Sequence, residues 1–278
     1  MKSGCTVRYW HRMSSGEIEQ AQTEEYSCII IPIVVIEAHG PFLPVGLDTM
    51  FAGVAAHMIA ERIEKSGARP IIFDCVPYSG VVGATYGLTG TIGFPAMLST
   101  EVLFNAWQWL FAHGFERFFI LNGDGSTASC LMPLLYRGTK ERQEFFRDRD
   151  GAISLFSWFD GMRESVSHAD VIEHGLYTYL CEHFDLHTRQ VAYRVGMTSP
   201  LQDEDLKSLD GIQRTYPTPR REFSSWASLE GQKEVYGVSC FSYDEYRAFL
   251  DSGKAHEIWQ RHIVNVTANM LAILSLEV

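Results

Sequence analysis

The hydrophobic positions in the first half of the chain fall into short continuous runs that alternate with helix-like patterns. Residues 28–36, 70–76 and 117–121 are rich in isoleucine, valine and phenylalanine, as strands are when helices cover both faces of a parallel sheet. Residues 48–65 and 100–113 instead repeat apolar side chains at helical spacing. This alternation predicts an α/β fold, a single three-layer domain with a mostly parallel sheet flanked by helices.

Local signals indicate where these two helices begin and end. Asp48 or Thr49 is a candidate N-cap of the first helix. Residues 99–101 supply a start signal for the second helix, and Gly114 supplies a stop signal. Residues 77–99 are rich in glycine, threonine and proline, and loops of this length in a compact domain are usually functional.

The second half of the chain is less regular. Residues 168–183 and 242–275 have helical patterns, the latter interrupted by a Ser-Gly pair. Residues 138–165 are charged and irregular, and we interpret them as an inserted loop. Residues 198–235 are interpreted as a polar insertion, so that the whole chain, residues 1–278, is expected to form one domain.

Composition and charge narrow the function classes. The formal net charge is −11, which argues against partners such as nucleic acids and anionic membranes. No apolar run approaches the roughly 20 residues that span a bilayer, and residues 1–20 lack the apolar core of a signal peptide. The six cysteines are scattered without a CxxC pair. We therefore expect free thiols and a cytoplasmic protein.

The residue types of a metal site occur where the first predicted strand ends. Glu37 and His39 are two positions apart, so on a strand they point to the same face, at the edge where open α/β sheets place their sites. A short loop then returns Asp48 toward the same edge. A carboxylate and an imidazole side by side can ligate a divalent metal. The alternatives are that Asp48 is only an N-cap and that Glu37 and His39 form a surface pair.

Two further segments carry candidate residues. Residues 122–126 follow the third predicted strand, and their glycines permit turns that bring Asp124 into the same crevice; an ordinary strand-to-helix turn is the alternative. Residues 168–174 contain His168 and Glu173, although such charged runs are often solvated helix faces. These two residues lie about 140° apart on a regular helix, so they share a site only if His168 precedes the helix.

These residues resemble the motifs of the creatininase (creatinine amidohydrolase) superfamily. Residues 37–49 match its pattern ExHGPxLPxGxDT throughout. The segment GTI…ETL is echoed at residues 90–92 and 100–103, HGFxxxxxxNGHGGN at residues 113–127, and HAGExETS more weakly at residues 168–175. The matches run in order through most of residues 28–180.

The resemblance implies a compact α/β fold, assembly into a hexamer, and one or two divalent ions that activate water against an amide, often a cyclic one. Carried over by position, Glu37, His39 and Asp48 look like metal ligands, with Asp48 bridging. His168 looks like a proton-handling residue near the substrate. Glu173 looks like a carboxylate that ligates the metal or supports a ligand.

The chain departs from the family pattern at several ligand positions. Asp124 replaces the histidine of NGHGGN, and an oxygen-rich shell suits manganese or iron better than zinc. The family's further carboxylate is missing, because Ser126 and Val171 occupy the two places where members carry it, and Thr85 stands where many have a histidine. We therefore expect one divalent ion (Mn, Fe or Zn) rather than two.

The function predicted from the sequence is a metal-dependent amidohydrolase-type enzyme that acts on an amide or lactam C–N bond of a small molecule. His168 would give the leaving nitrogen its proton. One alternative is a biosynthetic enzyme that performs acyl transfer, cyclisation or elimination on the same scaffold. Another is a catalytically inactive binding or structural homologue. By resemblance, the expected assembly is a homo-oligomer, a hexamer.

Overall fold

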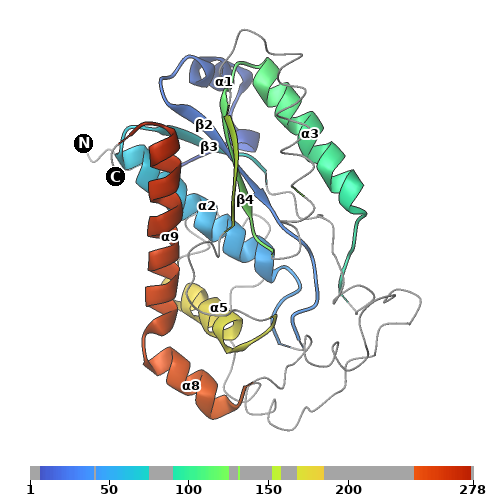
Figure 1. Ribbon diagram of the computed structural model, residues 1–278, viewed down its shortest axis with the longest axis vertical. Coiled ribbons are helices and arrows are strands. Elements are labelled where there is room, and N and C mark those ends of the chain that lie inside the picture. The colour runs from blue at the N-terminus through green and yellow to red at the C-terminus, as the bar shows by residue number, and fades with distance from the viewer. Residues whose placement is uncertain are drawn as a thin grey trace.

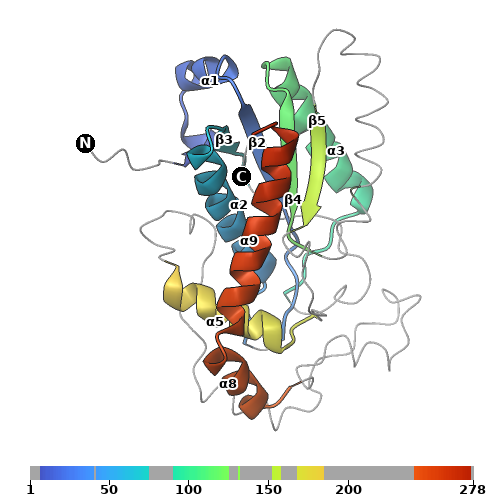
Figure 2. The ribbon, with the colours of Figure 1, turned by 60° about the vertical axis from the view of Figure 1, so that its left-hand side comes forward.

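The computed structural model describes residues 7–40, 42–74, 90–124, 131, 152–157, 168–184 and 241–276. Within them, five strands form one parallel sheet in the order β1-β3-β2-β4-β5. Figure 1 labels the three central strands, and Figure 2 also labels β5. The strands are β1 (Arg8–Tyr9), β2 (Ser27–Ile33), β3 (Arg69–Ile72), β4 (Arg117–Asn122) and β5 (Ala152–Ser157). The helices are α1 (Ser15–Gln22), α2 (Leu47–Lys65), α3 (Ala96–Ala112), α5 (Val171–His183), α8 (Tyr243–Asp251) and α9 (Lys254–Ile273), and a 3-10 turn spans Trp10–Arg12.

Helices cover both faces of this sheet, as the three-layer prediction requires (Figures 1 and 2). Successive residues of β2 point to opposite faces. Ile30 packs in the cluster that contains α2, α5 and α9, whereas Ile29 and Ile31 pack in the cluster that contains α1 and α3. All seven residues of β2 are buried, which explains why this segment is continuously hydrophobic.

The sheet also contains a strand that the sequence pattern did not predict. β5 lies within residues 138–165, which we interpreted as an inserted loop, and the structure shows that this interpretation is wrong for residues 152–157. β5 pairs only with β4, so among the described strands it is an edge strand. An edge strand pairs with a neighbour on one side only and is often short. Its run of hydrophobic residues is therefore shorter and less distinct than that of a central strand. The polar insertion predicted at residues 198–235 lies outside the described residues.

The helix boundaries decide which side chains are available for a site. The N-cap of α2 is Gly46, with no side-chain cap, so the prediction that Asp48 or Thr49 caps this helix is wrong. α3 begins at Ala96, about one turn before the predicted start, and ends before Gly114, whose φ of 98° confirms the predicted stop. Asp48 therefore does not cap the helix but lies in the first turn of α2.

The C-terminal helices follow the sequence pattern closely. α8 and α9 are separated at Gly253, whose φ is 71°, which confirms the predicted break. His262 has charged neighbours in the sequence, but it is buried and lies beside Trp259 in the core. No helix among the described residues is long and apolar enough to cross a membrane.

Candidate metal centre

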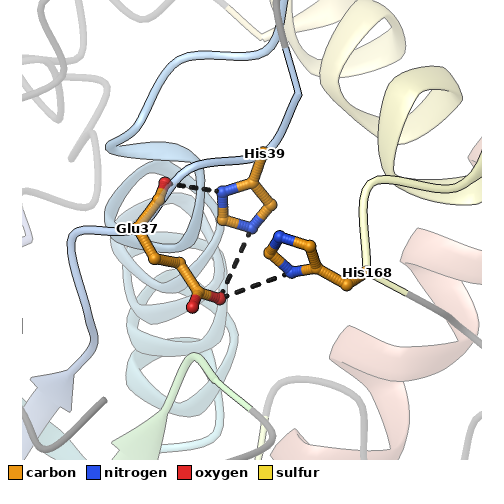
Figure 3. A group of neighbouring side chains, drawn as sticks. All are labelled: Glu37, His39 and His168. Atoms are coloured by element: carbon orange, nitrogen blue, oxygen red, sulfur yellow. Dashed lines mark hydrogen bonds and ion pairs between the residues drawn. The ribbon is translucent and has the colours of Figure 1, made fainter. Parts of the chain in front are cut away.

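Glu37 and His39 lie in the loop that follows β2, beyond the end of the strand (Figure 3). The prediction that they share one face of the strand is therefore wrong, although the two side chains lie in the same group of potential ligands. Backbone hydrogen bonds from Glu37 N to Val45 O (3.1 Å) and from Ile92 N to Ile36 O (2.9 Å) hold this loop in place. The tertiary structure, rather than strand alternation, brings the two side chains together.

Ala38 lies between Glu37 and His39, and both its backbone N–H and its carbonyl oxygen are hydrogen-bonded to side chains. The amide of Ala38 donates to Thr91 Oγ1 at 2.9 Å, and Nε2 of His168 donates to the carbonyl oxygen of Ala38 at 2.6 Å. Gly90 precedes Thr91 with a φ of 98°, and a Cβ there would lie 2.6 Å from Val45 Cγ1. Thr91 is a supporting residue to which the sequence analysis gave no role. The sequence feature that points to Thr91 is the GTI segment at residues 90–92.

The ring of His39 is oriented by its own loop. Nδ1 contacts the carbonyl oxygen of Glu37 at 3.0 Å, and because a carbonyl only accepts, the ring proton is on Nδ1. Nε2 then faces Oδ1 of Asp48 at 3.6 Å and Oε1 of Glu37 at 3.8 Å. Both distances are too long for hydrogen bonds. Histidines that ligate metals commonly donate their other nitrogen to a carbonyl in this way.

In His168 the proton is on Nε2, whereas in His39 it is on Nδ1. Its Nε2 donates to Ala38, so Nδ1 has no proton and lies 3.5 Å from Oε1 of Glu37 (Figure 3). Burial and the neighbouring His39 lower the pKa of His168 to about 3, so its ring is neutral. His168 precedes α5, which is the condition the sequence set for it to share a site with Glu173.

Asp48 is almost completely buried, and its Oδ2 has no hydrogen-bond partner. Burial, followed by repulsion from Asp124, raises the pKa of Asp48 well above its usual range. The N-terminus of α2 favours negative charge, but it does not satisfy this buried oxygen. An unpartnered buried oxygen is costly, and a bound cation would remove this cost.

The strand end before Asp124 presents this residue to the cluster. Asn122 Nδ2 donates to Asp124 O at 2.6 Å and to Ser157 Oγ at 3.1 Å, and Asn122 Oδ1 accepts from Asp124 N at 3.3 Å. A Cβ on Gly123 would lie 2.4 Å from Val34 Cγ1 and 3.1 Å from Asp48 O. Only glycine therefore permits this approach of β4 to the first turn of α2.

Glu173 enters the cluster from the first turn of α5. Asp170 caps this helix by accepting from Ile172 N at 2.9 Å and Glu173 N at 3.0 Å. Oε2 of Glu173 accepts from Ala169 N at 2.5 Å. Burial is the largest cause of a rise in the pKa of Glu173 to about 8. Because Asp170, Glu173 and His174 are all buried, the interpretation of this segment as a solvated helix face is wrong.

These side chains form three overlapping groups, within each of which the potential ligand atoms lie within 4.8 Å of one another. The groups are Glu37–His39–His168, His39–Asp48–Glu173 and Glu37–Asp48–Asp124. All six site residues predicted from the sequence thus lie in one cluster. Two ligands at about 2.1 Å from one ion lie roughly 3.0–3.4 Å apart. The separations of 3.5–3.8 Å around Glu37 and His39 are close to this spacing, so the residues fit a divalent ion.

Comparison with known proteins places this arrangement in a family. Residues 11–204 match the family model described as creatinine amidohydrolase. A 3-dehydro-scyllo-inosose hydrolase from Thermotoga maritima is 27% identical over 117 residues, which cover 42% of this chain and 36% of that protein. The matched segment thus spans about a third of the length of this curated relative.

Solved structures share the fold over nearly the whole chain. A tryptophan-to-phenylalanine variant of creatininase has a TM-score of 0.68 at 15% identity, covering 96% of this chain and 98% of that chain. A structure described as manganese creatininase has a TM-score of 0.66 at 14% identity, covering 95% and 98%. The family match includes every residue of this side-chain cluster. The chain therefore belongs to the creatininase (creatinine amidohydrolase) family.

Proposed function

We propose that this protein is a metal-dependent amidohydrolase-type enzyme that cleaves an amide or lactam C–N bond of a small molecule. One observation supports it most strongly. Nδ1 of His168 and Oε1 of Glu37 face each other at 3.5 Å, while the ring proton is engaged with Ala38 on the other side. A neutral imidazole nitrogen whose lone pair faces a buried carboxylate is placed to accept a proton beside the proposed ion.

The residues proposed to hold the ion are Glu37, His39, Asp48 and Asp124. Their donor set is mostly carboxylate oxygen, which favours manganese or iron over zinc. The chemistry that a bound divalent ion supplies is polarisation of a carbonyl group and a lower pKa for water. The description of one matched creatininase as a manganese form is in keeping with this assignment.

His168 is proposed to move the proton. Because Nε2 is engaged with the carbonyl of Ala38, the available position is Nδ1, which is a proton acceptor in the neutral ring. His168 therefore takes a proton from the attacking water at Nδ1 and then passes it to the leaving nitrogen. The hydrogen bond from Nε2 keeps the ring in this tautomer and fixes its direction.

The hydrolase relative favours hydrolysis over the alternative reactions on the same scaffold. That protein is named for hydrolysis of 3-dehydro-scyllo-inosose, whereas acyl transfer, cyclisation and elimination have no comparable support. An inactive binding homologue would have no reason to retain six clustered polar groups, five of them buried, with an unpartnered carboxylate oxygen, because they are costly without a ligand.

We also propose a homo-oligomer. Four of the eight large hydrophobic side chains that are exposed among the described residues lie on α3: Met97, Leu98, Val102 and Trp109. Apolar surface concentrated on one helix is typical of a surface that another chain covers. Light scattering at micromolar concentration should give a mass above that of one chain, and a monomer would contradict this proposal.

The test of the enzyme proposal combines elemental analysis with a substrate panel. Protein purified without chelator should contain a divalent transition metal and should hydrolyse members of a panel of small amides and lactams. Asp48→Asn should bind metal at least about tenfold more weakly and lose turnover. Less than about a tenth of an equivalent of metal in the wild type, with no uptake of added Mn, Fe or Zn, would contradict the proposal.

A further inference from the structure

We propose that the groove between the second half of α2 and the middle of α9 binds a small organic carboxylate with an apolar body. The groove has a volume of about 480 Å³, which is within the range of small-molecule sites. Arg62 lines the groove and follows Asp48 by fourteen residues on α2, a separation of about 21 Å along a helix. The groove is therefore separate from the candidate metal centre.

Part of the lining is apolar and can receive the body of such a ligand. Met58 from α2 and Val264 and Leu271 from α9 contribute this surface. Val264 is 43% exposed, so a ligand in the groove would cover apolar surface that is now in contact with water. Trp259 Nε1 donates to Sδ of Met58 at 3.1 Å, which fixes the position of the sulfur. The flexible thioether side chain adapts well to the shape of a bound alkyl group.

The charged groups of the lining leave a positive excess. Arg62 and Lys65 contribute two positive charges and Glu61 one negative charge, so their sum is +1, in a chain whose formal net charge is −11. Oε1 of Glu61 faces Nε2 of His57 at 3.4 Å, so this carboxylate is directed toward His57. The groove thus offers positive charge to an anion on an otherwise acidic protein.

The guanidinium of Arg62 is oriented by a neutral partner. Its Nη2 donates to Oε1 of Gln260 at 2.8 Å, a contact that joins α2 to α9. This amide fixes the direction of the guanidinium but leaves its charge in place. A guanidinium has five N–H groups, and those that Gln260 does not use can bind both oxygens of a carboxylate. A cation in the last turn of a helix also offsets the helix dipole, but that role requires no contact with α9.

The lining also contains a polar group that the fold leaves unpaired. Oγ1 of Thr267 is buried without a hydrogen-bond partner, and Thr267 lines the groove. An unpaired buried hydroxyl is unfavourable. A change of its side-chain rotamer toward the groove would let the hydroxyl donate to a ligand oxygen. A carboxylate with an apolar body uses all three features, whereas an inorganic anion or a neutral apolar molecule uses only some of them.

The test is a calorimetric titration of the full chain with hexanoate, with hexan-1-ol as a neutral probe of the same length. The wild type should bind one hexanoate per chain and should bind hexan-1-ol at least about tenfold more weakly, because hydrogen bonds between charged groups are stronger. Arg62→Gln should weaken hexanoate binding at least about tenfold for the same reason. Arg261→Gln is the matched control, since Arg261 lies on α9 and pairs with Glu257 outside the groove; its affinity should equal that of the wild type.

A second measurement locates the ligand. The chain has nine methionines, and carbon-13 labelling of their methyl groups gives an NMR signal for each. The Met58 signal is identified by its loss in Met58→Leu, and hexanoate should shift this signal most. Because a carboxylate can also bind a metal ion, Asp48→Asn is titrated in parallel, and it should bind hexanoate as tightly as the wild type does.

The outcomes that would overturn the proposal are distinct. Hexanoate that does not bind at millimolar concentration, or binds no more tightly than hexan-1-ol, would do so. Unchanged affinity in Arg62→Gln together with lost binding in Asp48→Asn would assign the carboxylate to the metal centre instead of the groove. Inorganic phosphate that binds as tightly as hexanoate, without a shift of the Met58 signal, would contradict the apolar part of the assignment. None of these results would alter the proposed hydrolysis, which is tested by metal content and turnover.

Discussion

Nδ1 of His168 lies 3.5 Å from Oε1 of Glu37, and the ring's proton is on the other nitrogen, where it binds the carbonyl of Ala38 at 2.6 Å. One side chain therefore does two things: it supports the loop that carries Glu37 and His39, and it directs a lone pair at the carboxylate cluster. The substitutions below separate these two contributions from each other and from the remaining supports of the site.

His168→Gln should keep the conformation of the loop but lose catalytic activity. The glutamine amide can donate to Ala38 as Nε2 does, but it has no basic nitrogen in the place of Nδ1. We expect kcat to fall by about 10²–10⁴-fold, with the thermal unfolding midpoint near that of the wild type. His168→Ala should in addition lower the midpoint, since it removes the hydrogen bond. Steady-state kinetics beside thermal unfolding would measure both, and full activity in His168→Gln would contradict the proton-transfer role.

Thr91→Val should weaken the support of the same loop from the other side. Valine has the shape of threonine but leaves the amide of Ala38 without its acceptor. We expect a loss of about 1 kcal/mol in the free energy of unfolding, measured by urea titration. Thr91→Ser, which keeps Oγ, should lose much less. Equal losses in the two variants would mean that packing of the methyl group, rather than the hydrogen bond, matters at this position.

Asn122→Ala should weaken metal binding without removing a ligand. The Asn122 side chain binds both the amide and the carbonyl of Asp124, so its loss should let the Asp124 carboxylate move. We expect the Kd for Mn²⁺ to rise about 10–100-fold, measured by calorimetry. Asn105→Ala, which removes an exposed asparagine whose side chain bonds to Glu101 O, is the control. An unchanged Kd in Asn122→Ala would show that Asp124 does not need this support.

Asp124→His should change which metal is preferred. Histidine restores the nitrogen that the family motif carries. An imidazole ligand suits zinc better than it suits manganese. We expect the ratio of the Zn²⁺ to the Mn²⁺ affinity to rise about tenfold or more in competition titrations. A ratio equal to that of the wild type would mean that Asp124 is not a ligand.

Asp48→Asn should stabilise the protein that contains no metal. Asp48 is buried, its Oδ2 has no hydrogen-bond partner, and Asp124 repels it, so a neutral amide removes an unfavourable charge. The unfolding midpoint of the metal-free variant should therefore exceed that of the metal-free wild type by a few degrees. Added Mn²⁺ should raise the wild-type midpoint and leave that of the variant nearly unchanged. A lower midpoint in the metal-free variant would contradict this account of the site.

Much of the fold could be predicted from the sequence because its signals are local. β2 is buried on both faces and reads as a continuous hydrophobic run, and Gly253 marks the break between α8 and α9 through its left-handed conformation. β5 was missed because, among the described strands, it lies at the edge of the sheet with only β4 as a neighbour. The burial of His262 could not be read from its charged sequence neighbours, because they do not show which helix face packs on the core.

The sequence by itself also determined which residue types gather at the site, because Glu37, His39 and Asp48 lie within twelve consecutive positions. Only the tertiary structure decided how they are used. The contact between His168 and Ala38 joins residues 130 positions apart, and it selects which ring nitrogen carries the proton. The approach of Glu173 to His39 and Asp48 likewise depends on how α5 packs beside the loop after β2. No local pattern encodes these contacts, because they are set by the packing of distant elements against one another.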